Sequence, residues 1–325
     1  MEKVYENIYK NEIPLPNNPL RIINSYIITS DDKNLIIDSG FNHEACKEAF
    51  FDAVSKLNLD LDNTYLLITH LHSDHSGLAS KLSKEGIKLY AGEIDGKMIN
   101  RMSKQEYWDN FNNYKTIFGL DKDNITFDDH PGYKYCPKEE IDFIPLNDGD
   151  TINIGEYSFD VVDIKGHTPG HIGLYEKNHK LFFSGDHILD RITPNIAFWG
   201  YEHGDILDVF LNNLNKINDY DIDIVFPAHR NIITDHQRRI KELKNHHNER
   251  LEEILKIVKE NPKITVRDVA SKMNWQFRAK SFLDFPNPQK WFACGEAMTH
   301  LLHLCYHNKI NKVDIDNTLY FKINI

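Results

Sequence analysis

Short apolar runs alternate with amphipathic stretches along most of the chain. Apolar runs bounded by Gly, Asn, Asp or Ser predict β-strands over residues 21–30, 34–40, 64–69, 87–92, 150–166, 180–186 and 221–229. Apolar residues at helical spacing predict helices over residues 43–59 and 206–217. Because strands and helices interleave and polar loops follow the strands, the pattern predicts a layered α/β domain.

Residues 93–145 interrupt this alternation with a long insertion rich in aromatic residues. The aromatic positions at about helical spacing are Tyr107, Trp108, Phe111, Tyr114 and Phe118. Two interpretations follow from this pattern. The insertion either forms a small satellite core of its own, or it is a lid whose inner face lines a substrate pocket.

The C-terminal part has a different pattern. It predicts helices over residues 250–261, 265–273 and 295–309 and a β-hairpin over residues 309–323. Three helices followed by a hairpin are the element order of a winged helix. We therefore expect a small winged-helix-like domain at this end of the chain.

Charge changes sign close to the start of that part. Residues 1–236 hold 22 Lys and Arg against 39 Asp and Glu, a net charge of −17, whereas residues 237–325 hold 16 against 10, a net charge of +6. Such a shift favours a domain boundary. We expect one domain over residues 1–236, which includes the insertion, and a second over residues 237–325.

Composition and length are typical of a soluble globular protein. The chain has 325 residues, enough for two domains with a sizeable core, and 41% of them are hydrophobic. No run approaches the roughly 18 apolar residues that a membrane span needs. The first residues show no secretory signal, and the four cysteines form no CxxC pair. We therefore expect a cytoplasmic protein with reduced thiols and no membrane partner.

Three histidines and an aspartate fall within the six positions "HLHSDH", residues 70–75. His70 and His72 are two apart, so they cannot share a helix face as the i, i+4 histidines of a helical zinc protease do. The motif follows the predicted strand 64–69 directly. This indicates a loop at a strand end, followed by a helix that begins near Ser76 and ends at Gly86.

Three further loops each present one residue of a metal-ligand type after an apolar run. These residues are His167, Asp186 and His229. Loops at the carboxyl ends of strands converge on one crevice of an α/β sheet, so the three can meet the motif at residues 70–75. Imidazole and carboxylate suit zinc and other first-row divalent ions. Five imidazoles and two carboxylates are too many for one tetrahedral site, whereas two ions that share a bridging carboxylate use them all.

With these motifs the chain resembles the metallo-β-lactamase superfamily over roughly residues 15–236. The HxHxDH motif is intact, and the later His, Asp and His follow in the order of the family. The resemblance implies a four-layer αββα sandwich, and it implies a role for each residue. His70, His72 and His167 would hold the first metal, Asp74, His75 and His229 the second, and Asp186 would bridge them. Asp38 of "IIDSG" matches the buried aspartate that orients ligands in the family.

The resemblance also implies the chemistry of a binuclear metal-dependent hydrolase. Two divalent ions would generate a metal-bridging hydroxide, which attacks an ester, thioester, lactone or phosphoester. Zinc is the expected metal, with iron and manganese as alternatives. Asp74 is placed to take up the proton, so we expect Asp74 and Asp38 to contribute to catalysis and no Ser or Cys nucleophile to be needed.

Departures from subfamily patterns narrow the substrate class. The best-known zinc β-lactamases carry Cys at the position of Asp186, which disfavours antibiotic hydrolysis. Flavodiiron proteins carry Glu at the position of His72, which disfavours redox chemistry. What remains resembles the glyoxalase II, lactonase and thioesterase branch, or the phosphodiesterase and RNA-processing branch. The stretches "HHNERLEEIL", "TVRDVA" and "AMTHLLHL" resemble the winged-helix-like domain of lactamase-like proteins in the second branch.

Charge bears on the choice between these branches. The basic C-terminal part would attract a phosphate backbone, but the acidic part that carries the site would repel a polyanion. We expect a small-molecule acyl substrate. The alternatives are phosphodiester cleavage, as by an endoribonuclease, and a non-enzymatic nucleic-acid-binding protein. A second copy of the chain, in a homodimer, is the remaining candidate partner.

Candidate substrate contacts come from the insertion and from the loops near the last two ligands. They are Trp108, Phe198, Trp199, Tyr201 and Arg230. The usual Gly-His-Gly around the last ligand reads Ala228-His229-Arg230 here. The arginine either pairs with surface acids or clamps a carboxylate or phosphate of the substrate. His171 and His187 lie beside ligands in the sequence and are either outer partners of the site or ordinary core residues.

Overall fold

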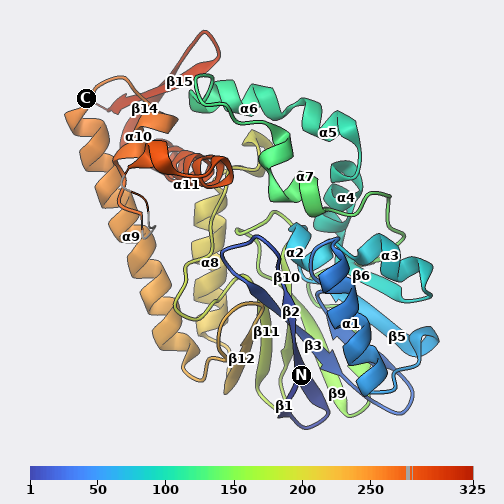
Figure 1. Cartoon of the computed structure of the whole chain (residues 1–325). Helices are drawn as coiled ribbons and strands as arrows, with labels where there is room; N and C mark the ends of the chain where they lie inside the picture. The colour runs from blue at the N-terminus through green and yellow to red at the C-terminus, as the bar shows by residue number, and fades with distance from the viewer. Residues whose placement is uncertain (276–278, 280, 325) are drawn as a thin grey trace.

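The structure is a computed structural model, and it describes residues 1–324 except 276–278 and 280. Two β-sheets face each other at the centre of the molecule, and a third, small sheet lies at the C-terminal end (Figure 1). The first sheet has the order β1-β2-β3-β4-β5-β6-β7. Its strands are β1 (Glu2–Tyr5), β2 (Ile8–Pro14), β3 (Ile22–Ile28), β4 (Asn34–Ile37), β5 (Thr64–Ile68), β6 (Lys88–Gly92) and β7 (Ile144–Leu146).

The second sheet has the order β12-β11-β10-β9-β8, and its β11 and β12 are parallel while the other pairs are antiparallel. Its strands are β8 (Thr151–Ile154), β9 (Tyr157–Asp163), β10 (Ile172–Glu176), β11 (Leu181–Gly185) and β12 (Ile224–Pro227). In the first sheet, β4 to β7 are parallel. Because these neighbouring strands are parallel, the loops that follow them begin at the same edge of the two sheets.

A hydrophobic core fills the space between the two sheets. Tyr26, Ile37 and Leu67 of the first sheet and Phe159 and Phe183 of the second belong to the same buried cluster. On the outer face of the first sheet lie α1 (Glu44–Lys56) and α3 (Ala79–Lys84), and on that of the second lie α8 (Ile206–Asn218) and the start of α9 (Figure 1). The chain therefore has a mixed, layered α/β fold, as the alternating pattern predicts, and its two sheets lie between two layers of helices, as the resemblance implies.

The insertion folds into short helices above one edge of the first sheet (Figure 1). They are α4 (Glu93–Met102), α5 (Gln105–Asp109), α6 (Phe111–Phe118) and α7 (Pro131–Tyr135). The expectation of a separate satellite core is wrong. Trp108, Phe111 and Phe118 belong to the same buried cluster as residues of α1 and of the C-terminal helices, and Phe111 stacks on Trp291 with ring centroids 3.9 Å apart.

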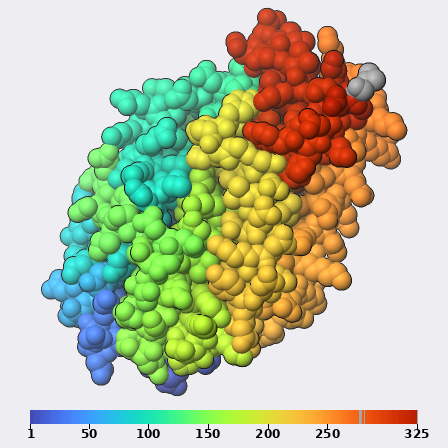
Figure 2. All heavy atoms as spheres, turned by 180° about the vertical axis from the view of Figure 1, so that it is seen from behind, coloured from blue at the N-terminus to red at the C-terminus, as the bar shows by residue number. Residues whose placement is uncertain are grey.

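The described residues of the C-terminal part form three α-helices and a small sheet. Its elements are α9 (His236–Glu260), β13 (Ile264–Thr265), α10 (Val266–Lys272), α11 (Asn287–Tyr306), β14 (Ile310–Ile315) and β15 (Thr318–Ile323). The three strands form an antiparallel sheet in the order β13-β15-β14. Seen from behind, the C-terminal hairpin projects above α8 and α9, which run side by side (Figure 2).

Most predicted elements are present, and the differences have local causes. The single helix expected from Ser76 to Gly86 is instead α2 (Ser73–Ser76) followed by α3. The two helices are separated at Gly77, where an added Cβ would lie 2.4 Å from the backbone nitrogen of Asn42. The backbone at Gly77 therefore packs directly against the backbone of the loop that contains Asn42. Strands β1, β2, β7, β10 and β13 were not predicted, and α9 begins well before residue 250 because its first turns pack on α8.

Short 3-10 helices complete the structure: η1 (Leu61–Asn63), η2 (Phe127–Asp129), η3 (Tyr201–His203) and η4 (Phe282–Asp284). The four cysteines are free thiols. None of the helices in the described part of the chain combines the length and the apolar character needed to traverse a lipid bilayer.

Candidate metal centre

Four loops bring the predicted ligand residues to one edge of the facing sheets. The motif at residues 70–75 follows β5, His167 follows β9, Asp186 follows β11 and His229 follows β12. Three overlapping groups of these side chains have their ligand atoms within 4.8 Å of one another. The groups are His70, His72 and His167; His70, His75 and Asp186; and Asp74, His75 and His229. All seven residues expected at the site are therefore brought together.

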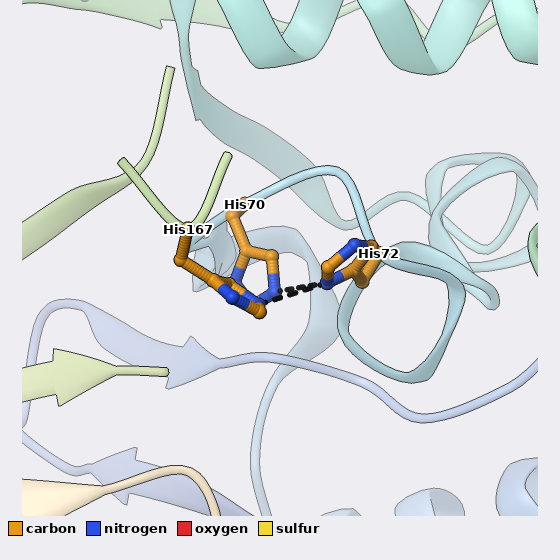
Figure 3. Close-up of side chains that lie close together, drawn as sticks. All are labelled: His70, His72 and His167. Carbon is orange, nitrogen blue, oxygen red and sulfur yellow. Dashed lines mark hydrogen bonds between the residues drawn. The ribbon is translucent and has the colours of Figure 1, made fainter. Parts of the chain in front are cut away.

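Three imidazoles form the first half of the site (Figure 3). His72 Nδ1 lies 3.0 Å from His70 Nε2 and 3.0 Å from His167 Nε2. The remaining ring nitrogens of two of them have partners: His70 Nδ1 is 3.1 Å from the Thr69 hydroxyl, and His167 Nδ1 donates to the Asn195 carbonyl at 2.7 Å. These contacts hold the Nε2 atoms of His70 and His167 towards a common point.

One carboxylate and two imidazoles form the second half. His229 Nε2 lies 3.4 Å from Asp74 Oδ2, and His75 Nε2 lies 3.9 Å from the same oxygen. Asp186 stands between the halves. Its Oδ1 is 3.6 Å from Nε2 of both His75 and His229, while its Oδ2 is 3.6 Å from His167 Nε2.

Asp38 supports the second half from behind. Its Oδ2 is 2.7 Å from His75 Nδ1, and its Oδ1 accepts from the Thr69 backbone N–H at 2.9 Å. The residue has a φ of 62°, in the left-handed region, which turns the chain sharply at the end of β4. Because a carboxylate oxygen only accepts here, His75 donates from Nδ1, and in the neutral, metal-binding form of the ring its Nε2 lone pair faces the site.

Electrostatics set the protonation of these groups. Burial lowers the pKa of His70 well below its usual value and that of His72 to about 3, so both imidazoles are neutral. Burial raises the pKa of Asp74, but the neighbouring His75 and His229 outweigh it and lower the pKa to about 2. Neutral imidazoles and ionised carboxylates are the forms that bind metal ions.

The residues fit a pair of divalent cations. Although burial opposes it, the carboxylates of Asp38, Asp186 and Asp74 raise the pKa of His75 well above its usual value, so negative charge accumulates at this point. Within the described structure, the buried atoms His75 Nε2, His229 Nε2 and Asp186 Oδ1 have no hydrogen-bond partner. A buried unpartnered polar atom costs about 1–3 kcal/mol, and coordinated cations would satisfy all three.

Asp95 is a residue of the site that the sequence analysis missed. It lies in α4, is 1% exposed, and accepts three hydrogen bonds: from Leu71 N at 2.9 Å, from the Thr168 hydroxyl at 2.5 Å and from Gly170 N at 2.6 Å. One carboxylate thus joins the loop of His70 and His72 to the loop of His167. Its position just after β6 follows the same strand-end rule as the ligands, which is the signal that could have identified it.

The predicted substrate contacts fall into different surroundings. The Trp199 ring lies 5.6 Å from that of His72, and its Nε1 donates to the His167 carbonyl at 3.0 Å. Phe198 instead packs against Tyr114 of the insertion, and Tyr201 packs against Phe198 and is 44% exposed. Of these three, only Trp199 has a ring contact with a candidate ligand in the described structure.

The other two predicted substrate contacts are Trp108, which is buried, and Arg230, whose side chain is exposed. Trp108 is 4% exposed, donates from Nε1 to the Met102 carbonyl at 2.7 Å and packs against Tyr133, so it is part of the core that the insertion shares with the C-terminal helices. Arg230 has an exposed side chain and a φ of 71°, and its carbonyl accepts from Asn24 Nδ2 at 2.9 Å. The backbone of Arg230 therefore shapes the turn after His229.

His171 and His187 are fully buried beside the site. The His171 ring lies 4.6 Å from that of His70, and the His187 ring lies 4.9 Å from that of Phe210. Neither ring nitrogen of either histidine has a hydrogen-bond partner in the described structure. Burial lowers the pKa of His187 to about 3, so it packs as a neutral ring.

Comparison with known proteins relates this geometry to a family. A sequence profile of the metallo-beta-lactamase superfamily matches residues 18–229. The chain is 26% identical over 199 residues to the hydroxyacylglutathione hydrolase GloC of Haemophilus influenzae, covering 60% of this chain and 81% of that protein. It is 24% identical over 176 residues to the acyl-coenzyme A thioesterase MBLAC2 of Bos taurus, covering 51% and 58% of the two chains.

A solved structure shares the fold over nearly the whole length. A metallo-beta-lactamase family protein from Thermus thermophilus superposes with a TM-score of 0.83 at 21% identity. The superposition covers 98% of this chain and 99% of that one. At this identity the likeness shows the fold, including the C-terminal part, and not the activity.

Proposed function

The chain belongs to the metallo-beta-lactamase superfamily and is a hydrolase of that superfamily, and we propose that it uses two divalent metal ions to cleave a small ester, thioester or lactone. One observation carries this proposal. The carboxylate of Asp186 has one oxygen 3.6 Å from His167 and the other 3.6 Å from His75 and from His229, so it is placed to bridge two ions.

The ligand sets follow from this arrangement. His70, His72 and His167 would hold one ion, and Asp74, His75 and His229 the other. We propose zinc, because it accepts imidazole and carboxylate ligands in open sites that leave room for substrate. When bound, the two ions supply Lewis acidity that polarises the scissile carbonyl and lowers the pKa of water towards about 7.

The residues of the chain supply the rest of the mechanism. Asp38 accepts the Nδ1 proton of His75 and so keeps the Nε2 lone pair directed into the site. Asp74 is ionised at neutral pH and can accept a proton on its carboxylate during the attack of water. The indole of Trp199 forms an apolar wall beside His72, against which an acyl group can pack.

The acyl class is supported by two relatives. One is named as an acyl-coenzyme A thioesterase and the other as a hydroxyacylglutathione hydrolase, and both names describe hydrolysis of an acylated compound. The acidic balance of residues 1–236 agrees with a small substrate rather than a polyanion.

A substrate panel tests the proposal. Protein reconstituted with zinc, iron or manganese is assayed against thioesters, lactones, aryl esters and bis-p-nitrophenyl phosphate. We expect kcat/KM for at least one carbonyl substrate to exceed that for the phosphodiester by more than about 100-fold, equivalent to about 2.7 kcal/mol of transition-state stabilisation. Chelation should abolish the activity. Turnover of the phosphodiester alone would reverse the substrate class, and metal-independent turnover would refute the mechanism.

We further propose that residues 237–325 form a winged-helix-like domain. The order α9, β13, α10, α11, β14, β15 and the small antiparallel sheet support this. The net charge of +6 keeps a nucleic-acid ligand as the second candidate. However, the recognition helix of such a domain exposes its side chains to a groove, whereas α11 is buried continuously from Ala293 to Leu304.

A binding measurement distinguishes a nucleic-acid-binding role of the C-terminal part from a purely structural one. If α11 only packs against the rest of the protein, fluorescence anisotropy with labelled RNA and DNA duplexes should show no binding at about 150 mM salt. Saturable binding that weakens steeply as salt rises would favour the nucleic-acid role, because each phosphate contact releases counterions.

A further inference from the structure

The loop between β11 and η3 connects the candidate metal centre to the C-terminal helices. The carbonyl of Asn195 accepts the Nδ1 proton of His167 at 2.7 Å. The side chain of the same residue points to α11, where its Nδ2 donates to Glu296 Oε2 at 2.8 Å and to the Phe292 carbonyl at 3.3 Å. One residue therefore orients a candidate ligand with its backbone and is itself anchored by its side chain.

Glu296 is a buried acidic residue of α11. It is 7% exposed, and its Oε1 lies 3.8 Å from the Nε of Arg250 on α9, close enough for an ion pair but too far for a hydrogen bond. Arg250 is 9% exposed, donates to Glu253 at 3.0 Å and lies over the Trp275 ring at 4.5 Å. The hydrogen bond from Asn195 Nδ2 is therefore the direct polar contact of the Glu296 carboxyl in the described structure, and the nearby guanidinium adds an electrostatic attraction.

The same loop contacts His167 a second time and lies close to α11. Trp199 donates to the His167 carbonyl at 3.0 Å. On the other side, a Cβ added at Gly295 would just reach van der Waals contact with the Cβ of Ala197, at 3.5 Å, so the helix and the loop lie about one methyl group apart at this point. Both the ring and the backbone of His167 are thus held by a loop that packs on the C-terminal part.

We infer that Glu296, together with Arg250, is a positioning residue for the metal centre: it anchors Asn195, whose carbonyl fixes the ring orientation and tautomer of His167. The inference rests on the proposed metal site. It gives the C-terminal part a role in the site that needs no nucleic acid. Removing a residue that hydrogen-bonds to a metal ligand typically weakens metal binding by about 10–100-fold.

Metal release from single variants tests the inference. Zinc-loaded protein is mixed with excess chromogenic chelator, and the rate of zinc release is measured. We expect Asn195→Ala and Glu296→Met to speed release by about 10-fold or more, within the range known for outer partners. Glu296→Gln should stay within about 3-fold of the unmodified protein, because its amide oxygen still accepts from Asn195 and less than 1 kcal/mol is lost.

Asn100→Ala is the matched control. Asn100 is a half-buried asparagine like Asn195, and it also ties a loop with two hydrogen bonds, to the nitrogen and the carbonyl of Ile141, but it contacts none of the candidate ligands. We expect this variant to lower thermal stability as Asn195→Ala does while leaving zinc release unchanged. Equal release rates for the two asparagine variants would overturn the inference.

A second readout needs no metal. Imidazole ¹⁵N spectra of the metal-free protein, with the His167 signals assigned by loss in His167→Gln, report which ring nitrogen carries the proton. We expect the Nδ1–H form in the unmodified protein and in Glu296→Gln, and a mixture of tautomers in Asn195→Ala and Glu296→Met. A mixture in the unmodified protein would overturn the inference. Protein with a pure Nδ1–H form that takes up no metal would refute the proposed function while leaving the positioning contact in place.

Discussion

His75 illustrates how the site depends on single residues. Its Nδ1 donates to Asp38 at 2.7 Å, and its Nε2 lies within 4 Å of both Asp74 and Asp186. The residue sits in the four-residue helix α2, which begins directly after His72. The short helix after β5 thereby directs two adjacent side chains, Asp74 and His75, into the same half of the centre.

The candidate ligands give the first prediction. His70→Ala or Asp186→Asn should lower turnover by more than about 100-fold, beyond the range for residues that only hydrogen-bond to a ligand, because each removes a group that would contact an ion directly in the proposed site. Bound metal, measured by mass spectrometry, should fall from two ions per chain. His246→Ala, a histidine outside the site, should keep both metal and activity. Wild-type turnover in a folded ligand variant would refute the site.

Among the elements, α4 fastens the two loops that carry the three-histidine half. Asp95 of α4 accepts from residues of both loops; it lies 24 residues from Leu71 in the sequence and 73 and 75 residues from Thr168 and Gly170. Burial raises the pKa of Asp95 to about 6, although hydrogen bonds from Thr168, Leu71 and Gly170 oppose the rise. The insertion therefore contributes to the site through its first helix, whether or not the rest acts as a lid.

Asp95→Asn is predicted to loosen both loops. An amide has one acceptor oxygen, so at least one of the three hydrogen bonds is lost, at a cost of about 1–3 kcal/mol. We expect a lower melting temperature together with weaker zinc binding, measured by competition with a chelator. The exposed Asp142→Asn is the control. A stability loss with unchanged zinc affinity would limit Asp95 to a structural role.

Two tryptophans separate core packing from substrate contact. Trp108→Ala should lower the free energy of unfolding by about 3–5 kcal/mol because the indole is buried in the core that the insertion shares with the C-terminal helices. Trp199→Ala should raise KM for acyl substrates by about 10-fold, the loss of roughly 1.4 kcal/mol of apolar contact. Urea unfolding and steady-state kinetics measure the two effects. A rise in KM for Trp108→Ala beyond that for Trp199→Ala would favour the lid.

At the scale of the whole molecule, one hydrophobic cluster joins the catalytic layers, the insertion and the C-terminal helices. Phe50 of α1, Phe118 of α6 and Leu301 of α11 belong to it. An ion pair between Asp123 of the insertion and Arg267 of α10, at 2.6 Å, lies at the same contact. Stability is therefore shared between the part that carries the ligands and the part that follows residue 236.

Glu296 predicts a pH dependence of that stability. Burial raises its pKa from 4.5 to about 7, although Arg250 and the bond from Asn195 oppose the rise. The folded state therefore binds a proton on Glu296 more tightly than the unfolded state does. The resulting stabilisation of the folded state is fully present below pH 4.5 and is lost as the pH rises through 7, by up to about 3 kcal/mol. Glu296→Gln has no such titration.

Urea unfolding at pH 5 and pH 8 measures this effect. The free energy of unfolding of the unmodified protein, relative to that of Glu296→Gln, should be lower at pH 8 than at pH 5. The exposed Glu249→Gln should follow the unmodified protein at both. Parallel pH profiles for the unmodified protein and Glu296→Gln would show that the Glu296 carboxyl titrates near its ordinary value.

The sequence by itself determined the strand-end loops and the seven residues that they bring together. This was possible because both signals are local. An apolar run reports a buried strand, a polar loop follows it, and the residue types His and Asp report the chemistry. The assignment of individual roles, and of the substrate class, came from a resemblance between motifs and remains a proposal.

The tertiary structure alone decided which surfaces meet. Nothing in the local pattern could show that Asn195 reaches Glu296, 101 residues away, or that Asp95 closes two distant loops. It also decided that the aromatic insertion shares its core with the C-terminal helices instead of forming a separate one. Periodicity reports that a face is buried, whereas its partner is set by the packing of the whole chain.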